Sequence, residues 1–533
     1  MPPPGTSCAK PGYNTIQAAV NAASPGDTIT ICPATYAEQV SVTTSGITLA
    51  GKPGATVVPP APGFLGPLVA VGTLADNGAD VTGVVVKGLK VDGQNSAGTP
   101  GGTRLIASPA GIRYENASGA IRSNQVLNVN DPACFGCQSG VAILAHTNAG
   151  HTANVIVSGN TVSGFQKGGI VADAGAAGSD FTAGAGLTGT VSKNQVTGAG
   201  VINNQAQNGI QVSRGAKASV VGNTVSDVIY ANPSDADTTS AAILLYDAGN
   251  GVLVNANTVS RFDIGIDNES DNGSGQNAVI SGNVVNGNRN APSDNPSGCG
   301  TVLKGIDSND AAVTISGNSV TNVQLDPALL GCQTGVGIRS GIFSDDGVAS
   351  PLLSVIRNNS VSDIQKGGIV VNGDMNVGRV QGNTVTGWGN SSALAQNLIQ
   401  FGFGATGSIG GSTAPKGNHL DNFGGYTGNG SLAHDSAAGI LLYKAGGLVG
   451  IHQNVFRATP GIVNPGTGTI PGGYAVVLET DDPFAGVGTP DANALKNDWG
   501  VYTSAEISSL IWDYNDDPGD QLGVVSFVPF LGP

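Results

Sequence analysis

A ten-residue phrase that recurs along the chain constrains its fold more than any other feature. VIVSGNTVSG, residues 155–164, joins two short apolar alternations through a corner at Asn160. A phrase that returns every ~25–40 residues indicates a solenoid, in which each coil packs only on its neighbours. The repeated asparagine is predicted to stack on its counterparts and form an internal row of amide hydrogen bonds. Related phrases are centred on Asn124, Asn194, Asn223, Asn257, Asn283, Asn318, Asn359 and Asn383, with weaker copies at Asn418 and Asn454.

Composition narrows the classes of partner. The chain has 533 residues, of which 83 are glycine, and a formal net charge of −15. A solenoid accommodates this length because its core grows lengthwise. The acidity and the lack of a basic patch exclude nucleic acid as an expected partner. No apolar run approaches the ~18 residues of a membrane span, so no membrane association is expected.

The six cysteines predict three disulfides and an oxidising compartment. Cys8 and Cys32 flank the first predicted helix, Cys134 and Cys137 share one loop, and Cys299 and Cys332 fall at similar places in consecutive coils. A metal site at Cys134 and Cys137 is the alternative, but the chain has no second CxxC and only five histidines. The opening MPPPGTSCAK looks like a start methionine on a mature secreted sequence, so the protein is expected to be extracellular.

The N-terminal stretch suggests a fold family. Residues 13–25 are predicted to form an amphipathic helix, capped by Asn14 or Thr15, and residues 27–51 are β-rich and alternating. This opening closely resembles that of secreted right-handed parallel β-helix proteins, including pectin methylesterases and pectate-lyase-like proteins. The resemblance spans roughly residues 12–480 and implies an all-β, right-handed parallel β-helix whose helix covers the open end of the first coil. The expected parts are a cap and first coil (1–50), the coils (51–480) and a C-terminal cap (481–533) with a short helix from Ser504 to Ile511.

A longer repeat is superimposed on the coils. DPACFGCQSGVAI at 131–143 matches DPALLGCQTGVGI at 326–338, and SGFQKGGIVAD at 163–173 matches SDIQKGGIVVN at 362–372. The two segments, about 131–260 and 326–457, are interpreted as a tandem duplication of about five coils. Lys167 and Lys366 in the shared QKGG phrase are interpreted as structural residues.

Candidate chemistry follows from strand alternation. Each coil contains a G-I-x-x-x strand, and because the isoleucine points inward the next residue points outward. Two aspartates and an arginine, Asp267, Asp307 and Arg339, are predicted on consecutive rungs of this outer row. Adjacent like charges destabilise a sheet unless something offsets them, and they split each other's pKa. The full predicted row is Arg113, Leu144, Val171, Gln211, Leu244, Asp267, Asp307, Arg339, Val370, Gln400 and Leu441.

Three functions are compatible with this row. The first is a secreted glycoside hydrolase that uses Asp267 and Asp307 as a carboxylate pair ~5 Å apart, with no required cofactor. The second is a polysaccharide lyase in which the two aspartates hold Ca²⁺ and Arg339 lies near the abstracted proton. The third is a non-catalytic extracellular binding or structural solenoid. The motifs of pectin methylesterases and polygalacturonases are missing, and five residues are predicted to bind the glycan: Arg339, Gln211, Glu269, Tyr246 and Trp388.

Overall fold

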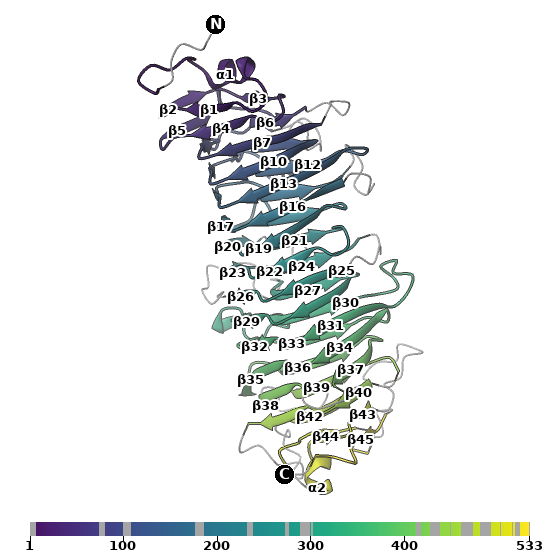
Figure 1. Ribbon diagram of the computed structural model, residues 1–533. Coiled ribbons are helices and arrows are strands. Elements are labelled where there is room, and N and C mark those ends of the chain that lie inside the picture. Colours follow the sequence, from purple (N-terminus) through teal and green to yellow (C-terminus); the bar gives the residue numbers. More distant parts are fainter. Residues whose placement is uncertain are drawn as a thin grey trace. The chain divides into compact units, whose positions relative to one another are not determined.

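The computed structural model divides the chain into two compact units, Met1–Phe262 and Asp263–Pro533. Both units are nearly all-β, and each is built from three parallel sheets whose strands follow one another coil by coil (Figure 1). This architecture is a right-handed parallel β-helix, as the repeated corner phrase and the N-terminal resemblance predict. The structure describes residues 7–73, 80–99, 108–175, 186–231, 238–271, 277–287, 299, 302–411, 417–426, 437–447, 449–459, 473–479, 492–501, 503–513, 515–516 and 523–531.

The strands of unit 1 form three sheets, and within each sheet neighbouring strands follow in chain order. Sheet 1 contains β1 (Thr28–Ile31), β4 (Thr48–Gly51), β7 (Val81–Lys87), β10 (Ala117–Arg122), β13 (Thr152–Ser158), β16 (Gly186–Ser192), β19 (Lys217–Val221) and β22 (Leu253–Asn255). Sheet 2 contains β2 (Ala34–Ala37), β5 (Ala55–Val58), β8 (Lys90–Asp92), β11 (Gln125–Leu127), β14 (Thr161–Ser163), β17 (Gln195–Ile202), β20 (Thr224–Tyr230) and β23 (Thr258–Phe262). Sheet 3 contains β3 (Val40–Val42), β6 (Pro67–Gly72), β9 (Ala110–Glu115), β12 (Val141–His146), β15 (Gly168–Asp173), β18 (Asn208–Ser213) and β21 (Ala241–Tyr246).

The strands of unit 2 follow the same plan. Sheet 1 contains β25 (Asn277–Ser281), β28 (Ala312–Ser316), β31 (Leu352–Arg357), β34 (Asn376–Gln381), β37 (Thr406–Gly410), β40 (Val449–His452), β43 (Ala492–Asn493) and β45 (Val525–Ser526). Sheet 2 contains β26 (Val284–Asn286), β29 (Ser319–Thr321), β32 (Ser360–Val361), β35 (Thr384–Ser391), β38 (His419–Tyr426) and β41 (Val455–Ala458). Sheet 3 contains β24 (Ile264–Glu269), β27 (Lys304–Asn309), β30 (Val336–Gly341), β33 (Gly367–Asn372), β36 (Asn397–Gly402), β39 (Ala438–Tyr443), β42 (Tyr474–Glu479) and β44 (Ile511–Trp512).

Two inward-facing rows form the core of each unit. The isoleucines of the G-I strands are fully buried, from Ile112 to Ile243 in unit 1 and from Ile266 to Ile440 in unit 2. The corner asparagines form the predicted amide row. Asn318 Nδ2, for example, donates to Asn359 Oδ1 at 2.9 Å and to Ile280 O at 3.0 Å. Each amide therefore satisfies polar groups of two neighbouring coils, which a buried polar side chain requires.

The N-terminal helix closes one end of unit 1. Helix α1 (Ile16–Ala22) is capped by Thr15, whose Oγ1 accepts from Ala18 N at 3.1 Å. It packs on β1 and β3 and buries Ile16 and Val20. The Gln17 amide donates to Ser41 O at 3.1 Å and accepts from Ser41 N at 2.7 Å, so it pairs with the edge of β3 as a peptide group would. The helix thus covers the first coil, as predicted.

Unit 2 contains a short α-helix and a 3₁₀ turn whose residues are all described. The helix predicted from Ser504 to Ile511 is shorter: α2 spans Ser504–Ser508 and starts with a capping box between Thr503 and Glu506. A 3₁₀ turn, η4, spans Pro327–Leu329. No helix in the described ranges is long and apolar enough to cross a membrane.

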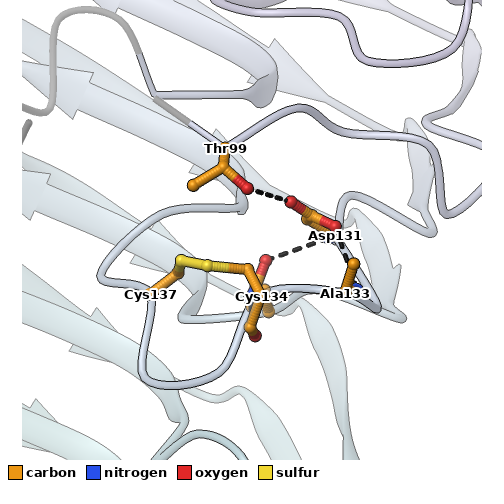
Figure 2. Close-up of a disulfide and its surroundings, with 6 residues drawn as sticks. Thr99, Asp131, Ala133, Cys134 and Cys137 are labelled. Carbon is orange, nitrogen blue, oxygen red and sulfur yellow. Dashed lines mark hydrogen bonds between the residues drawn. A yellow bond between two sulfur atoms is a disulfide. The ribbon is translucent and has the colours of Figure 1, made fainter. Parts of the chain in front are cut away.

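The six cysteines form the three predicted disulfides. Cα–Cα distances are 5.4 Å for Cys8–Cys32, 5.8 Å for Cys134–Cys137 and 5.1 Å for Cys299–Cys332. Figure 2 shows Cys134 and Cys137 in their loop beside Asp131, which accepts from Thr99 Oγ1 and from Ala133 N. The alternative of a metal site at these two cysteines is therefore wrong, because both sulfurs are in a disulfide.

Candidate active site in the second unit

The register of sheet 3 places three charged residues on consecutive strands of unit 2. Asp267 on β24 pairs with Asp307 on β27, and Asp307 pairs with Arg339 on β30. The rest of the predicted outer row is also confirmed within each unit, from Arg113 to Leu244 and from Asp267 to Leu441. The spacing from each corner asparagine to the next G-I strand is therefore sufficient to predict which side chains are neighbours.

The outer row is less exposed than strand alternation alone suggests. Asp267 is 5% exposed and Asp307 is fully buried, and Leu144 and Val370 in the same row are also buried. Alternation determines which side of the strand a residue is on, but it does not determine whether other side chains cover that side. The two carboxyl groups therefore lie in a poorly hydrated environment, where charge–charge interactions are strong.

Asp307 is held as an anion by its neighbours. Lys304 Nζ forms an ion pair with its Oδ2, and Arg339 Nη1 donates to both carboxylate oxygens at 3.2 Å. Asn309 Nδ2 donates to Oδ2 at 3.2 Å, and Arg339 also donates to Asn309 Oδ1 at 2.6 Å. Burial on its own raises the pKa of Asp307, but the charges of Lys304 and Arg339 and these hydrogen bonds outweigh it, so the pKa is lowered.

Asp267 has the opposite behaviour. Burial, and then the negative charges of Asp307 and Glu269, raise its pKa well above the ordinary aspartate value, against the smaller effects of Lys304 and Arg339. Its buried Oδ1 has no hydrogen-bond partner in the structure. The pKa values of the two adjacent carboxyl groups are thus shifted in opposite directions, so Asp267 keeps its proton to a higher pH than Asp307 does. Pairs whose environments separate their pKa values in this way supply the acid and base groups of many enzymes.

Lys304 belongs to this cluster although its sequence pattern does not predict it. Strict alternation from Asp307 would place Lys304 on the inner side of β27. The pairing of β27 with its neighbouring strands instead passes from Lys304 to Ile306 and omits Gly305. An added Cβ on Gly305 would lie 2.5 Å from Gly337 O. The Lys304 side chain consequently lies beside Asp307. The glycine in the repeated G-I phrase is the signal for this irregularity.

The predicted binding residues are only partly brought together. Glu269 pairs in register with Asn309 beside the two aspartates. Gln211 and Tyr246 belong to unit 1, where Gln211 accepts from Asn208 Nδ2 and donates to Ser213 Oγ, both at 2.9 Å. Trp388 lies on β35 in sheet 2, where its backbone N–H donates to Gln396 Oε1 at 2.9 Å. The coil of Trp388 is not adjacent to that of β27, so this ring is not next to the carboxyl pair.

Unit 1 contains a second charged cluster that sequence reasoning missed. His146 Nδ1 is 2.8 Å from Glu115 Oε1, and its Nε2 is 3.1 Å from Gly175 O and 3.6 Å from Asp173 Oδ2. Arg113 pairs with Glu115, and Arg214 donates to both oxygens of Asp173 at 2.8 and 2.7 Å. These residues come from successive coils and form no motif, so only the sheet register could have grouped them.

This second cluster is enclosed. Glu115, His146 and Asp173 are each exposed by 3% or less. Burial on its own raises the pKa of Glu115, but the hydrogen bond from His146 and the charge of Arg113 outweigh it, so the pKa is lowered. The cluster therefore resembles a satisfied buried polar network more than a site open to substrate.

The donor set near Asp267 and Asp307 does not favour a cation. The oxygens of Asp307 already accept from a lysine and an arginine, whose positive charges would repel Ca²⁺. Among the residues that the structure describes, no group of three or more His, Cys, Asp or Glu side chains is arranged to hold a metal ion.

Comparison with known proteins gives only distant likenesses. No family model matches the chain, and no curated protein matches it. Among solved structures it is similar to the A-module of a mannuronan C-5 epimerase from Azotobacter vinelandii, at 12% identity and a TM-score of 0.32, covering 88% of this chain and 95% of that one. It is also similar to the catalytic unit of a GH87 alpha-1,3-glucanase from Streptomyces thermodiastaticus, at 12% identity and a TM-score of 0.34, covering 100% and 68%. A family 28 exopolygalacturonase from Yersinia enterocolitica gives 12% identity and a TM-score of 0.26, covering 96% and 74%. These values assign neither a family nor a reaction to the chain.

Proposed function

We propose that this protein is a glycoside hydrolase that cleaves a polysaccharide or oligosaccharide with Asp267 and Asp307. The observation that carries the proposal is the opposite direction of the two pKa shifts in side chains on adjacent strands. Glycoside hydrolysis needs one protonated and one ionised carboxyl group on either side of the scissile bond. A glycan is the substrate class because the opening of the chain resembles secreted carbohydrate-active β-helix proteins, which is an argument from analogy.

The spacing of the pair supports a retaining mechanism. Neighbouring strands lie about 4.8 Å apart, close to the ~5–5.5 Å between the carboxyl groups of retaining enzymes. Asp267 would donate its proton to the glycosidic oxygen of the leaving group while Asp307 attacks the anomeric carbon, giving a glycosyl ester and a free leaving-group hydroxyl. Asp267, now ionised, would then take a proton from water as that water displaces Asp307.

Lys304 and Arg339 support the role of Asp307. Their charges keep it ionised before attack, and the same donors are available to the carboxylate when the glycosyl ester breaks. This arrangement also argues against the alternative of a Ca²⁺-dependent lyase. Arginine is not deprotonated in proteins, so Arg339 cannot act as the base that a lyase requires.

We also propose that the enzyme is secreted and needs no cofactor. The three disulfides are the supporting observation for secretion, because such bonds persist in oxidising compartments. The net charge of −15 argues against nucleic acid as a partner.

The proposal is tested by screening purified protein against a panel of soluble glycans with two readouts. New reducing ends without ultraviolet absorbance indicate hydrolysis, whereas absorbance from an unsaturated product, lost on chelation, indicates the lyase. Asp267→Asn and Asp307→Asn are each expected to lower kcat by a factor of about 10²–10⁴. Asp421→Asn, which changes a strand aspartate on β38 in sheet 2, is the matched control and should leave kcat unchanged.

A non-catalytic solenoid is the second candidate function. It is favoured by the full burial of Asp307 and by its contacts with three protein side chains, which a structural ion-pair network would also show. If both asparagine variants retain full activity on a cleaved glycan, the assignment of the pair is wrong. If no glycan is cleaved by the wild-type protein, the non-catalytic function is supported instead.

A further inference from the structure

The duplicated segments share their internal hydrogen bonds as well as their sequence. Gln166 Nε2 donates to Cys134 O at 3.1 Å, and its counterpart Gln365 donates to Cys332 O at 2.9 Å. Lys167 Nζ donates to Ala206 O at 3.0 Å, and Lys366 donates to Ala395 O at 2.8 Å. These matched contacts confirm the structural interpretation of both lysines. They also mean that each strand of sheet 3 from β12 to β21 in unit 1 has a counterpart from β30 to β39 in unit 2.

The two segments differ most where the strands of sheet 3 end. In unit 1 the ends of β12, β15 and β18 are polar and closed, with Arg214 bonded to Asp173 and Asn148 Nδ2 bonded to Glu115 at 2.9 Å. In unit 2 the counterparts of these charged or bonded groups are different residues. They are Gly341 for His146, Phe343 for Asn148, Asn372 for Asp173, Gly402 for Ser213 and Phe403 for Arg214.

The backbone at this edge is the same in both units. Arg214 has a φ of 53° and Phe403 a φ of 54°, so both occupy the same left-handed turn conformation after their strands. The replacement therefore changes the side chain that the turn presents and leaves its path unchanged. An arginine that seals a buried carboxylate in unit 1 corresponds to a phenylalanine that is 47% exposed in unit 2.

The exposed ring of Phe403 packs against a second aromatic ring. Phe403 meets Tyr443 edge to face, with ring centroids 5.2 Å apart and an interplanar angle of 69°. Lys444 Nζ lies 4.9 Å from the centroid of the Tyr443 ring. This arrangement holds Tyr443 against the sheet and makes Phe403 the ring that remains available to a ligand. Aromatic rings held in this way offer an apolar face at a small cost in conformational entropy.

Two amides and two glycines lie on the strands that lead to Phe343 and Phe403. Gln400 Nε2 donates to Asn372 Oδ1 at 3.1 Å, and a Cβ on Gly402 would lie 2.7 Å from that same Asn372 oxygen. Phe343, two strands before Phe403, is half-buried, and its ring lies 3.3 Å from where a Cβ of Gly341 would be. Gly341 and Gly402 are the partners of Asn372 on the two neighbouring strands, so neither strand places a Cβ beside its half-buried side chain.

We propose that Phe343, Asn372 and Phe403 form a subsite for a neutral sugar residue of the glycan, an inference that rests on the proposed function. Phe403 would stack on the apolar face of the sugar ring, and the Asn372 amide would bond its hydroxyl groups. Phe403 follows β36, three strand spacings or about 14 Å along sheet 3 from Asp307 on β27. A chain cleaved at the aspartates would therefore reach the subsite only if it extends several sugar units beyond the scissile bond.

The charged residues beside Phe403 favour a neutral sugar over an acidic one. Asp374, in the turn after β33, is exposed and lies against Gly404 in the turn after β36, and the hydroxyl and backbone N–H of Ser344 donate to its carboxylate. Lys444, the nearby cation, is buried and lies against Tyr443. An acidic sugar at Phe403 would therefore meet the carboxylate of Asp374.

The test is native affinity electrophoresis in gels that contain a soluble neutral polysaccharide, namely dextran, xyloglucan or galactomannan. Phe403→Ala and Phe343→Ala are each expected to raise the apparent Kd by roughly tenfold. Phe403→Tyr, which keeps the ring, and Leu353→Ala, which removes an exposed apolar side chain from β31 in sheet 1, should bind as the wild type does.

A double variant keeps the test independent of folding. Asn372→Asp with Phe403→Arg rebuilds the Asp173–Arg214 pair of unit 1 on the same backbone, so it should preserve the melting temperature while abolishing retardation. The subsite is overturned if both alanine variants are retarded like the wild type, or if none of the three polysaccharides retards the wild type. Asp267→Asn should bind normally, and if that variant also cleaves normally, the proposed function fails while the subsite stands.

Discussion

Asp267 and Asp307 show that two aspartates on adjacent strands of one sheet can differ in their chemistry. Both are buried on the outer side of sheet 3, but Asp307 has two cationic neighbours in contact and Asp267 has an oxygen with no partner. The pKa values therefore move apart, and their difference defines a pH range in which one group is protonated and the other is not.

Activity is therefore expected to follow a bell-shaped pH profile. Protonation of Asp307, whose pKa is lowered, sets the acid limb below the ordinary aspartate value, and ionisation of Asp267, whose pKa is raised, sets the alkaline limb above it. The two limbs belong to the coupled pair and are measured from kcat/KM against pH. If kcat/KM does not change with pH from about 3.8 upward, the assignment of Asp267 as the acid is contradicted.

Stability depends on the same two groups with opposite signs. The raised pKa of Asp267 contributes stability that is complete below its unfolded value and is lost as pH rises through the folded value. The lowered pKa of Asp307 contributes stability that is present above its unfolded value and is lost as pH falls through the folded value. Asp267→Asn should therefore gain free energy of unfolding relative to wild type at neutral pH, as measured by denaturant titration.

Gly341 provides a test of positioning without changing any charged group. An alanine Cβ there would lie 2.8 Å from Arg339 Nη2, so the guanidinium must move from Asp307. We expect Gly341→Ala to lower kcat by about tenfold and to shift the acid limb of the pH profile upward, because Asp307 loses part of its stabilisation. Gly331→Ala is the control, since its Cβ would meet only Ala393 O at 3.4 Å. An unchanged acid limb would show that Arg339 does not set the pKa of Asp307.

The sequence predicts which residues of this site are neighbours better than it predicts which other side chains surround them. Asp267, Asp307 and Arg339 are found because strand alternation and coil spacing are strict. Lys304 is missed because the ladder skips Gly305, and the His146 cluster because its members share only a register. The sequence predicts Trp388 only as an aromatic residue near a loop. It does not show that Trp388 lies on β35, a strand of sheet 2.

The amide row links each coil of unit 2 to the next. Asn359 donates to Asn383 Oδ1 at 2.9 Å and to Ile315 O at 3.1 Å, and its Oδ1 accepts from the backbone N–H and from Nδ2 of Asn318. Asn359→Ala should lower the free energy of unfolding by about 4 kcal/mol, since each of the four lost bonds contributes ~1 kcal/mol. Ser360→Ala, at the exposed next position, is the control for thermal or denaturant unfolding. Equal stability of both variants would show that the row contributes little.

Strand segments are more predictable than the ends of the molecule. The corner asparagine and the buried isoleucine recur from coil to coil, so each copy reinforces the prediction of the others. The helix at the C-terminal end has no such repetition, and it stops at Ser508 rather than Ile511 because Ile511 pairs with Val476 in sheet 3.

The two units each carry a charged cluster, at different positions along sheet 3. The cluster around His146 is enclosed, whereas Lys304 and Arg339 are partly exposed beside Asp307. His146→Gln should therefore reduce the free energy of unfolding by about 2 kcal/mol, through loss of the bond to Glu115, and leave kcat unchanged. Loss of glycan cleavage in a fully folded His146→Gln protein would indicate that unit 1 contributes to catalysis.

The pairing of Gln17 with Ser41 has a consequence for assembly. A solenoid that ends in a bare strand offers the same hydrogen-bonding groups to a second molecule as it does to its own next coil. Gln17 occupies those groups on β3 with a side-chain amide, and helix α1 covers the apolar interior beside them. The Gln17 side chain therefore blocks these backbone groups from pairing with a strand of a second molecule.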